Sequence, residues 1–342
     1  MSALPTSPAS PSAPPLGLSS LDFGAQTEQH RRELLVHCYR MLGSLEDAED
    51  LVQETLLRAW RRRDTYARRA PLRAWLYKIA TNACLDVLAQ RPRRSLPTAR
   101  GEPADPAAPS APAPTEPIWL EPFPDAWLAP ESDNPEAHYT LRESVTLAFL
   151  TALHLLTPRQ RAVLLLRDVL DWPASEVASA LDLSVPAVKS ALHRARTLVS
   201  RRYQAVRPEA LAGQAADPAR RALLEQYVQA WEMGDAVALT RLLTADATFS
   251  MPPTPDWYRG RDNIRALVSR TVFGGQAAGR WRLRPTTASS QPAFGIYQLD
   301  SGEYRAYGIQ VVTLTGAAIA GILTFRNPGL VGRFGLPPIR PA

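Results

Sequence analysis

Residues 173–202 read PASEVASALDLSVPAVKSALHRARTLVSRR, and this stretch decides the class of the fold around it. A short helix is expected over Ser175 to Leu181, and Asp182 to Ser184 then turn the chain. A longer helix is expected over Val185 to Arg202, because Pro186 is tolerated in a first helical turn. Two helices joined by so short a turn indicate a helix-turn-helix.

The second helix of this pair has two different sides. The inward stripe comprises Val188, Ala191, Leu192, Ala195 and Leu198. The other side contains no acid and comprises Lys189, Ser190, His193, Arg194, Arg196, Arg201 and Arg202. Such a helix suits the major groove, with Ser184 as its N-cap and Lys189, Ser190, His193 and Arg194 as candidate DNA contacts. An ordinary helical hairpin with a solvated basic face is the alternative, and His193 could be a plain surface residue.

The composition favours a polyanionic partner. The 342 residues have a formal net charge of +6, and nearly all of the positive charge is arginine, whose planar guanidinium suits phosphate. Cys38 and Cys84 lie among apolar residues and are expected to be buried thiols in a reducing compartment. We find no export signal and no run long enough to cross a bilayer, so we expect a soluble, cytoplasmic protein.

Composition shifts divide the chain into modules. Residues 91–134 contain eleven prolines and predict an extended tether, although the segment Ile118 to Leu128 (IWLEPFPDAWL) is too aromatic to stay in water and should dock. After residue 217, helices and strand-like runs predict an α+β domain, with Pro285 restricting its strand to a sheet edge. The predicted division is an irregular tail over 1–27, a helical unit over 28–91, the linker over 92–134, a second helical unit over 135–205, the α+β domain over 217–328 and a terminal tail over 329–342.

The first helical unit has two distinctive surfaces. Residues 46–54 (EDAEDLVQE) open a helix with negative charge, which indicates a basic protein partner or simply a solvated helix start. The helix over Pro71 to Ala89 interleaves basic and aromatic residues, a pattern that suits single-stranded DNA. Trp75 and Tyr77 could instead belong partly to the core.

These two units, in this order, resemble the extracytoplasmic-function, or group IV, sigma-70 factors. The resemblance covers residues 29–203 and rests on GSLEDAEDLVQET (43–55), PLRAWLYKIATNACLD (71–86) and LTPRQRAVL (156–164). It implies core RNA polymerase, through its β′ clamp and β subunits, and promoter DNA as partners. It further implies that Asp47, Asp50, Gln53 and Glu54 face the clamp, that the helix-turn-helix reads the minus-thirty-five element, and that the minus-ten element is melted and read by Tyr66, Arg73, Trp75, Lys78 and Asn82.

The remaining sequence resembles the subgroup, including the mycobacterial sigma G and sigma J types, in which a SnoaL-like domain follows the sigma core. WLEPFPD (119–125), LEQYVQAWE (224–232) with Gly234-Asp235, and DATFSMPP (246–253) carry this resemblance. It implies a cone-shaped α+β barrel that modulates the sigma core. A small-ligand pocket there would be lined by Phe249, Met251, Trp257, Tyr258 and Phe273, each of which could equally be core.

Catalysis by the last domain lacks support, because it contains no histidine and Asp246 is readily explained as a cap. No metal-ligand spacing and no phosphate-binding glycine loop is present, so we expect neither a metal nor another cofactor. The Gly- and Pro-rich end, with Leu330, Val331, Phe334 and Leu336, is expected to be irregular but docked on the sigma core or on polymerase. The rival interpretations are a ligand-sensing helix-turn-helix regulator that acts without polymerase and, more weakly, an isomerase-like enzyme with a DNA-binding appendage.

Overall fold

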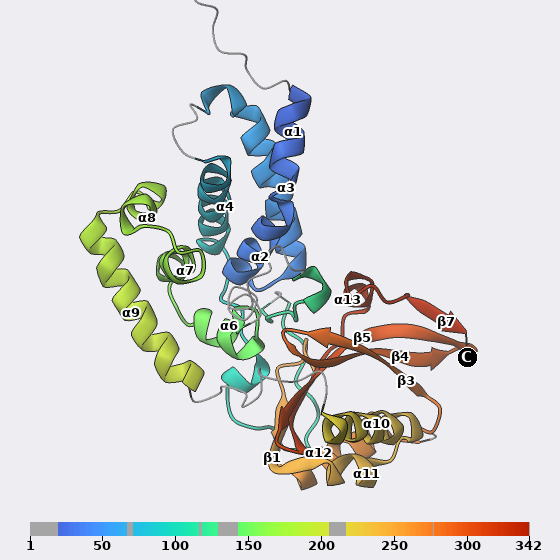
Figure 1. The fold of residues 1–342 in the computed structure, drawn as a ribbon. Helices are drawn as coiled ribbons and strands as arrows, with labels where there is room; N and C mark the ends of the chain where they lie inside the picture. Colours follow the sequence, from blue (N-terminus) through green and yellow to red (C-terminus); the bar gives the residue numbers. More distant parts are fainter. Residues whose placement is uncertain are drawn as a thin grey trace, which may run out of the picture.

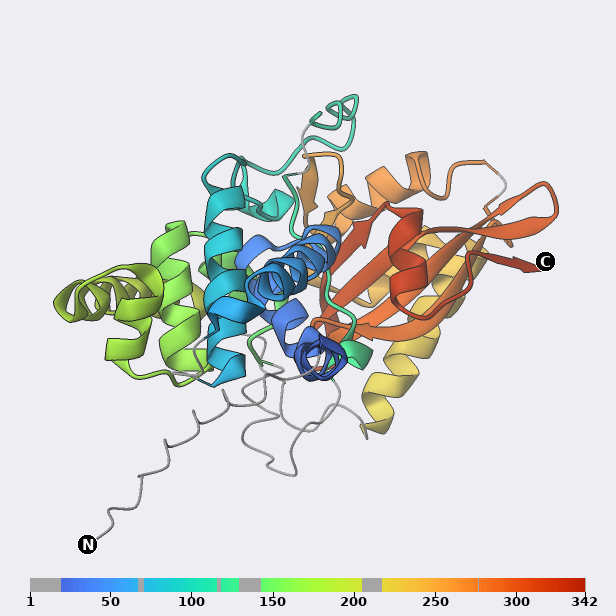
Figure 2. The same cartoon turned by 90° about the horizontal axis from the view of Figure 1, so that it is seen from above.

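A computed structural model of the chain describes residues 20–66, 71–115, 118–128, 143–204, 217–275 and 277–341. Two helical units lie beside each other, and a mixed sheet with its own helices follows them (Figure 1). Viewed from above, the linker runs between the helical units and the sheet domain (Figure 2). No helix of the described part of the chain is both long and apolar enough to cross a membrane.

The N-terminal helical unit consists of α1 (Ser20–Glu28), α2 (Arg31–Leu42), α3 (Leu45–Arg61) and α4 (Leu72–Leu88). The turn between α2 and α3 is sharp because Gly43 adopts a left-handed conformation and the Ser44 side chain caps α3 by accepting from the Asp47 N–H. Helix α1 corrects the expected irregular tail over 1–27. Its Phe23 is buried against the unit, and this contact stabilises a segment too short to be helical alone.

The helix-turn-helix unit consists of α6 (Leu147–Leu153), α7 (Pro158–Leu164), α8 (Ala174–Leu181) and α9 (Val185–Gln204), and a π-helical turn over Leu165–Val169 extends α7. Thr157 and Gln160 form a reciprocal capping box at the start of α7. The expected helix breaks near Thr157 and Asp182 are confirmed. The expected helical start at Pro135 lies outside the described residues.

The C-terminal domain contains α10 (Pro218–Met233), α11 (Ala236–Arg241), α12 (Arg261–Arg270) and α13 (Pro328–Arg333). Its strands are β1 (Leu243–Ser250), β2 (Trp257–Arg259), β3 (Trp281–Ala288), β4 (Gln291–Asp300), β5 (Glu303–Thr315), β6 (Ala318–Phe325) and β7 (Ile339–Pro341). The sheet order is β2-β1-β6-β5-β4-β3, with β7 added beside β5, and only β1 and β6 pair in parallel. The edge position expected for β3 from Pro285 is confirmed.

The two faces of this sheet bury different cores. One face packs on α10 and α12 through a cluster that includes Trp231, Phe249 and Phe294. Side chains of the other face, including Tyr297 and Val311, belong to the same buried cluster as the helices of the N-terminal unit. The sheet therefore has no freely solvated face along its centre, and the domain rests on the helical part of the chain.

The linker corrects the expectation of a free tether. Trp119, Leu120 and Phe123 are buried, as predicted for the aromatic segment. Upstream of them, the Ala104 N–H donates to the Trp257 carbonyl, and the Arg270 guanidinium donates to carbonyl oxygens of the linker. The linker is thus fastened to the N-terminal helical unit near both of its described ends and to the C-terminal domain as well.

The terminal tail is regular, which corrects a second expectation. Asn327 caps α13, and β7 pairs with the start of β5. The predicted docking is confirmed, because Leu330, Val331 and Phe334 are buried and the Arg333 side chain lies 3.0 Å from the Glu49 carboxylate on α3. The prediction was wrong because it treated glycine and proline as residues that exclude regular structure. Here both occupy positions where they are tolerated, at the start of α13 and in the turn that follows it.

Candidate nucleic-acid and polymerase interfaces

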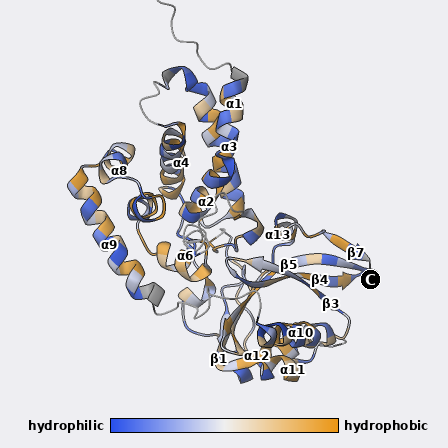
Figure 3. Ribbon diagram, in the orientation of Figure 1, coloured by the Kyte–Doolittle hydropathy of each residue, from blue (hydrophilic) through white to orange (hydrophobic). Residues whose placement is uncertain are grey.

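The outer side of α9 is a basic surface. The stripe predicted to face inward is buried at Val188 and Ala195, whereas Lys189, Ser190, His193 and Arg194 are all exposed. Hydrophobic and hydrophilic segments accordingly alternate along the helix (Figure 3). The Ala187 N–H donates to the Ser184 hydroxyl over 3.3 Å, which confirms the predicted cap. This surface is shaped for a groove, and its contact with DNA stays a prediction.

Aromatic rings gather where α1, α3 and α4 meet. The Tyr66 and Trp75 ring centroids lie 5.0 Å apart, and Phe23 approaches Trp75 edge-on at 6.4 Å. Phe23 also contacts Trp60, over which the Arg63 guanidinium lies at 4.8 Å. Trp75 is half-buried, so the alternative that it belongs partly to the core is correct. The packing fixes the direction of rings on which bases could stack.

Three polar residues of α4 that were predicted to contact DNA form hydrogen bonds or ion pairs within the protein. The Lys78 ammonium donates to the Ser179 carbonyl over 3.0 Å, and the Asn82 amide donates to the Ala180 carbonyl over 3.5 Å. Both carbonyls belong to the last turn of α8, whose orphan acceptors need partners. Arg73 forms an ion pair with Glu33 at 2.7 Å. The helix-turn-helix unit therefore covers part of the face predicted to read single-stranded DNA.

The acidic residues of α3 have different environments in the first turn and further along the helix. Asp50 and Gln53 are exposed, and Glu54 forms an ion pair with Arg58 one turn further on. Asp47 departs from the expected outward orientation, because its carboxylate accepts from Arg91 at 2.5 Å and from Arg94 at 2.8 Å. Burial raises the pKa of Asp47, but these two guanidinium groups outweigh burial and hold it below its ordinary value.

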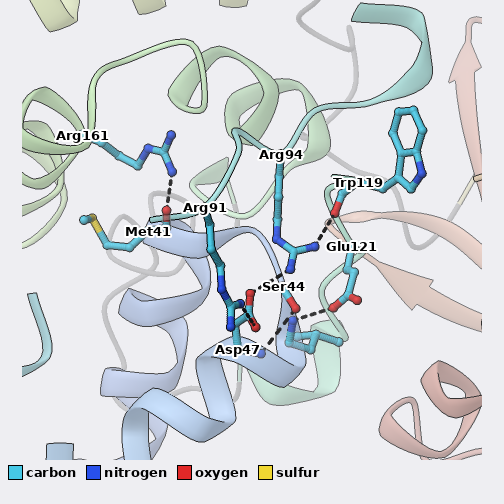
Figure 4. A network of polar contacts seen from close by, with 9 residues as sticks. Met41, Ser44, Asp47, Arg91, Arg94, Trp119, Glu121 and Arg161 are labelled. Carbon is cyan, nitrogen blue, oxygen red and sulfur yellow. Dashed lines mark hydrogen bonds and ion pairs between the residues drawn. The ribbon is translucent and has the colours of Figure 1, made fainter. Parts of the chain in front are cut away.

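The first turn of α3 is where the linker docks (Figure 4). The Glu121 carboxylate accepts from the Leu45 N–H over 2.7 Å, and the Arg94 guanidinium donates to the Trp119 carbonyl over 3.0 Å. Burial raises the pKa of Glu121, and the Leu45 N–H opposes this rise. On the far side of the linker, the Phe123 N–H and carbonyl pair with Ser289 in the β3–β4 turn. One short segment thus joins α3 to the sheet.

Two buried arginines join the helical units, and neither has a carboxylate partner within the described residues. Arg161 on α7 donates to the Met41 carbonyl of α2, and Arg40 on α2 donates to the Ser144 hydroxyl. Burial lowers the pKa of Arg161 to about 9 and that of Arg40 to about 10. Each side chain keeps its Nε atom without a hydrogen-bond partner. Burial of such cations is costly, so this interface is weaker than its buried area implies.

The residues predicted to line a ligand pocket lie in the packing of the C-terminal domain. Phe249 and Tyr258 belong to its core cluster, and Met251 packs against that cluster. The Trp257 indole is covered by the linker and donates to the Gly101 carbonyl. A different cavity of about 510 Å³ opens between α10 and the β3–β4 hairpin, with Leu224, Val228 and Phe294 in its wall. Within the described residues, no cluster of three candidate metal ligands occurs.

Several of the residues that shape these surfaces were not identified from the sequence. The sequence indicates burial of Phe23 only weakly, because it is a lone aromatic residue in a polar stretch. Arg161 and Gly43 were quoted within motifs but were assigned no role, and nothing local marks a buried arginine or a glycine crowded by distant segments. Their contacts are made by parts of the chain far apart in sequence.

Comparison with known proteins agrees with this architecture. Family models match at residues 27–94 (sigma-70 region 2), 146–199 (sigma-70 region 4) and 224–326 (SnoaL-like domain). The crystal structure of the Mycobacterium tuberculosis extracytoplasmic function sigma factor SigJ superimposes with a TM-score of 0.56 at 24% identity, covering 92% of this chain and 99% of that one. The fold and its surfaces define a sigma-type transcription-initiation factor with a fused SnoaL-like domain.

The sequence relatives make the assignment narrower. The ECF RNA polymerase sigma factor SigG of Mycobacterium tuberculosis is 44% identical over 322 residues, covering 92% of this chain and 84% of the relative. SigJ of the same organism is 28% identical over 292 residues, covering 83% and 80%. The chain belongs to the family of ECF RNA polymerase sigma factors, which direct transcription initiation.

Proposed function

We propose that α3 binds core RNA polymerase, that α4 and its aromatic neighbours read the melted minus-ten strand, and that α9 reads the minus-thirty-five element. The observation that carries this proposal is the coexistence of an exposed acidic helix with an exposed basic recognition helix. A regulator that binds only duplex DNA needs the second surface but not the first. Asp50, Gln53 and Glu54 remain the candidate polymerase contacts, and Asp47 acts in the proposal by holding the linker.

The described arrangement is, in this proposal, a closed form that precedes polymerase binding. Lys78 and Asn82 cannot contact a DNA base while they cap α8. Opening removes that cap and breaks the Arg161 and Arg40 contacts, whose buried charges regain water. The burial of the Arg161 and Arg40 charges supports the idea that polymerase and promoter DNA can displace this interface.

The C-terminal domain modulates this opening through two contacts in the proposal. The linker pairs with the β3–β4 turn at Ser289, and α13 contacts α3 through Arg333 and Glu49. The domain acts here as a binding partner in cis and not as a catalyst, since Asp256 is used to accept from the linker at the Ala111 N–H. A small ligand, if it regulates the domain, would occupy the cavity beside α10, which adjoins the same hairpin.

Run-off transcription with core polymerase on a genomic promoter library tests the main proposal. The full chain should give transcripts that share an upstream motif. Asp50→Arg should reduce core binding, while Asp262→Arg, an equal charge change at an exposed position of α12, should not. Lys189→Ala with Arg194→Ala should abolish motif-specific transcripts but leave core binding intact. A chain that activates no promoter and does not bind core polymerase would instead support the ligand-sensing regulator.

The proposed role of α4 in melting the promoter is tested with a template that is already melted. A template with a preformed bubble should respond less to Lys78→Ala than duplex promoter does, since strand separation is no longer required. Equal loss on both templates would mean that Lys78 does not act in melting.

A further inference from the structure

The C-terminal domain holds most of the excess charge of the chain. Residues 217–341 contain fourteen arginines, nine acidic residues and neither lysine nor histidine, against a formal charge of +6 for the whole protein. The linker over residues 92–134 carries seven acidic residues and three arginines and can balance part of this excess, but among the described residues none of its carboxylates forms an ion pair with Arg284 or Arg340. Excess positive charge is an argument about partners, and it points to a polyanion.

Part of this charge lies together on one sheet face. Arg282 of β3 stacks over the Tyr304 ring of β5 at 5.2 Å, and Arg340 of β7 lies over the Tyr297 ring of β4 at 5.9 Å. The strand registers place Arg282 opposite Tyr297 and Arg340 opposite Tyr304. Arg284 follows Arg282 at the two-residue spacing that keeps side chains on one side of a strand. These five residues are called the arginine face.

The charges of the arginine face are only partly neutralised. Arg282 forms an ion pair with Glu232 at 3.1 Å, and its side chain is still 43% exposed. Among the described residues, neither Arg284 nor Arg340 has a carboxylate within ion-pair distance. Burial raises the pKa of Tyr297, and the charges of both Arg340 and Arg284 oppose that rise, in keeping with their position near this ring.

Their positions over aromatic rings restrict the Arg282 and Arg340 guanidinium groups before they meet an anion. A guanidinium already held over a ring loses less conformational freedom when its N–H groups meet phosphate oxygens. Arg284 is exposed at the edge strand β3, where no further strand covers it. Arg284 and the Arg282 side chain are therefore accessible to a long, rigid polyanion, whereas the Tyr297 and Tyr304 rings of the face are buried.

We infer that the arginine face binds the phosphate backbone of duplex promoter DNA. This inference goes beyond the proposed contacts of α4 and α9, because it gives the fused domain a DNA contact of its own. Duplex DNA is favoured over other polyanions because the domain is tethered to two DNA-reading units and so meets promoter DNA at a high effective concentration. Contacts to phosphate carry no sequence information, so the domain would add affinity without changing the promoter motif.

The test measures the salt dependence of DNA binding by the full chain. Fluorescence anisotropy follows a labelled duplex of arbitrary sequence over roughly 50 to 200 mM KCl. Arg284→Gln with Arg340→Gln should make the slope of log K against log salt shallower by about 2, so that wild type loses about tenfold more affinity across this range. Arg284→Lys with Arg340→Lys should keep most of the slope, because the charges remain.

The control removes the same charge elsewhere. The control variant combines Arg241→Gln on α11 with Arg265→Gln on α12, and its slope of log K against log salt should stay near that of wild type. Binding to core polymerase should be unchanged in both double variants. A wild-type slope in the Arg284 and Arg340 pair, or an equal change in the control pair, would overturn the inference. So would weaker core binding without a change in slope, which would assign the face to a protein partner. If the Arg284 and Arg340 substitutions weakened binding of single-stranded RNA more than binding of duplex DNA, duplex DNA would be rejected as the ligand.

Discussion

Replacement of Gly43 by alanine should release the linker and the helix-turn-helix unit from the N-terminal unit. Gly43 lies in the turn between α2 and α3 at a φ of 73°, in the left-handed region. A Cβ added there would meet Leu120 of the linker at 2.3 Å and His154 of the helix-turn-helix unit at 2.8 Å. Both neighbours are fully or almost fully buried, so neither can move aside into solvent.

The cost has two parts, and they can be separated. A left-handed conformation costs alanine about 1–2 kcal/mol relative to glycine, and the crowding of two buried side chains adds about 1–3 kcal/mol. Gly316 in the β5–β6 turn has a φ of 56° and nothing within 4 Å of its added Cβ. Gly316→Ala therefore carries the conformational cost alone, and the difference between the two variants measures the crowding.

Energy transfer between two dyes reports the separation of the helix-turn-helix unit from the N-terminal unit. Cysteines introduced at Ala89 and Ser175, both exposed, would be labelled, while Cys38 and Cys84 are buried. Gly43→Ala should shift the population toward low transfer by about 5- to 150-fold beyond Gly316→Ala. If the closed form limits activity, run-off transcription at limiting core polymerase should rise as the low-transfer population rises. Equal transfer in both variants would show that the convergence at Gly43 does not hold the units together.

Three further outcomes follow from individual contacts. A double-mutant cycle of Arg333→Gln and Glu49→Gln should give a coupling of about 0.5–1 kcal/mol in favour of docked α13, since the pair is partly exposed; additive effects would contradict the contact. Burial lowers the pKa of His37 to about 3, so the folded chain keeps it neutral while the unfolded chain protonates near 6.5. Stability is therefore lost as pH falls from 6.5 toward 3, by about 2 kcal/mol at about pH 5, and His37→Gln should show a correspondingly shallower pH dependence in urea unfolding. Ser184→Ala should destabilise α9 by about 1 kcal/mol in thermal unfolding and lower DNA affinity, whereas Ser184→Thr should do neither.

Local patterns predicted the elements whose stability is local. The strand-like character expected after residue 217 is confirmed in β3 and β5, because glycine or polar turns that are visible in the sequence enclose each strand. The recognition helix was predicted with its cap for a similar reason, since Ser184 and the apolar stripe are both visible in one short window. Such features require no knowledge of distant contacts.

Features that depend on distant contacts were not predictable in this way. Asp47 and Glu54 lie on nearly the same side of α3, and periodicity gives them the same environment. Asp47 forms ion pairs with Arg91 and Arg94, which lie with the linker beside the first turn, whereas Glu54 pairs with Arg58 of its own helix. In the same way, the aromatic content of residues 118–128 predicted that the linker docks but could not identify what it docks on.

The linker position gives the C-terminal domain access to both functional helices. Its Glu121 caps the start of α3, the helix with the proposed polymerase contacts, while Leu120 packs at the turn that also supports His154 of the helix-turn-helix unit. A movement of the β3–β4 hairpin that broke the Ser289 pairing would therefore free the α3 N-terminus and loosen the second unit together. Separate regulators of the two units are not needed, because one docked segment already couples them. This coupling predicts that Ser289→Ala, which removes the hydroxyl that accepts from the Phe123 N–H, should change core binding and interdomain energy transfer in parallel. Independent changes in the two measurements would mean that the linker holds only one of the units.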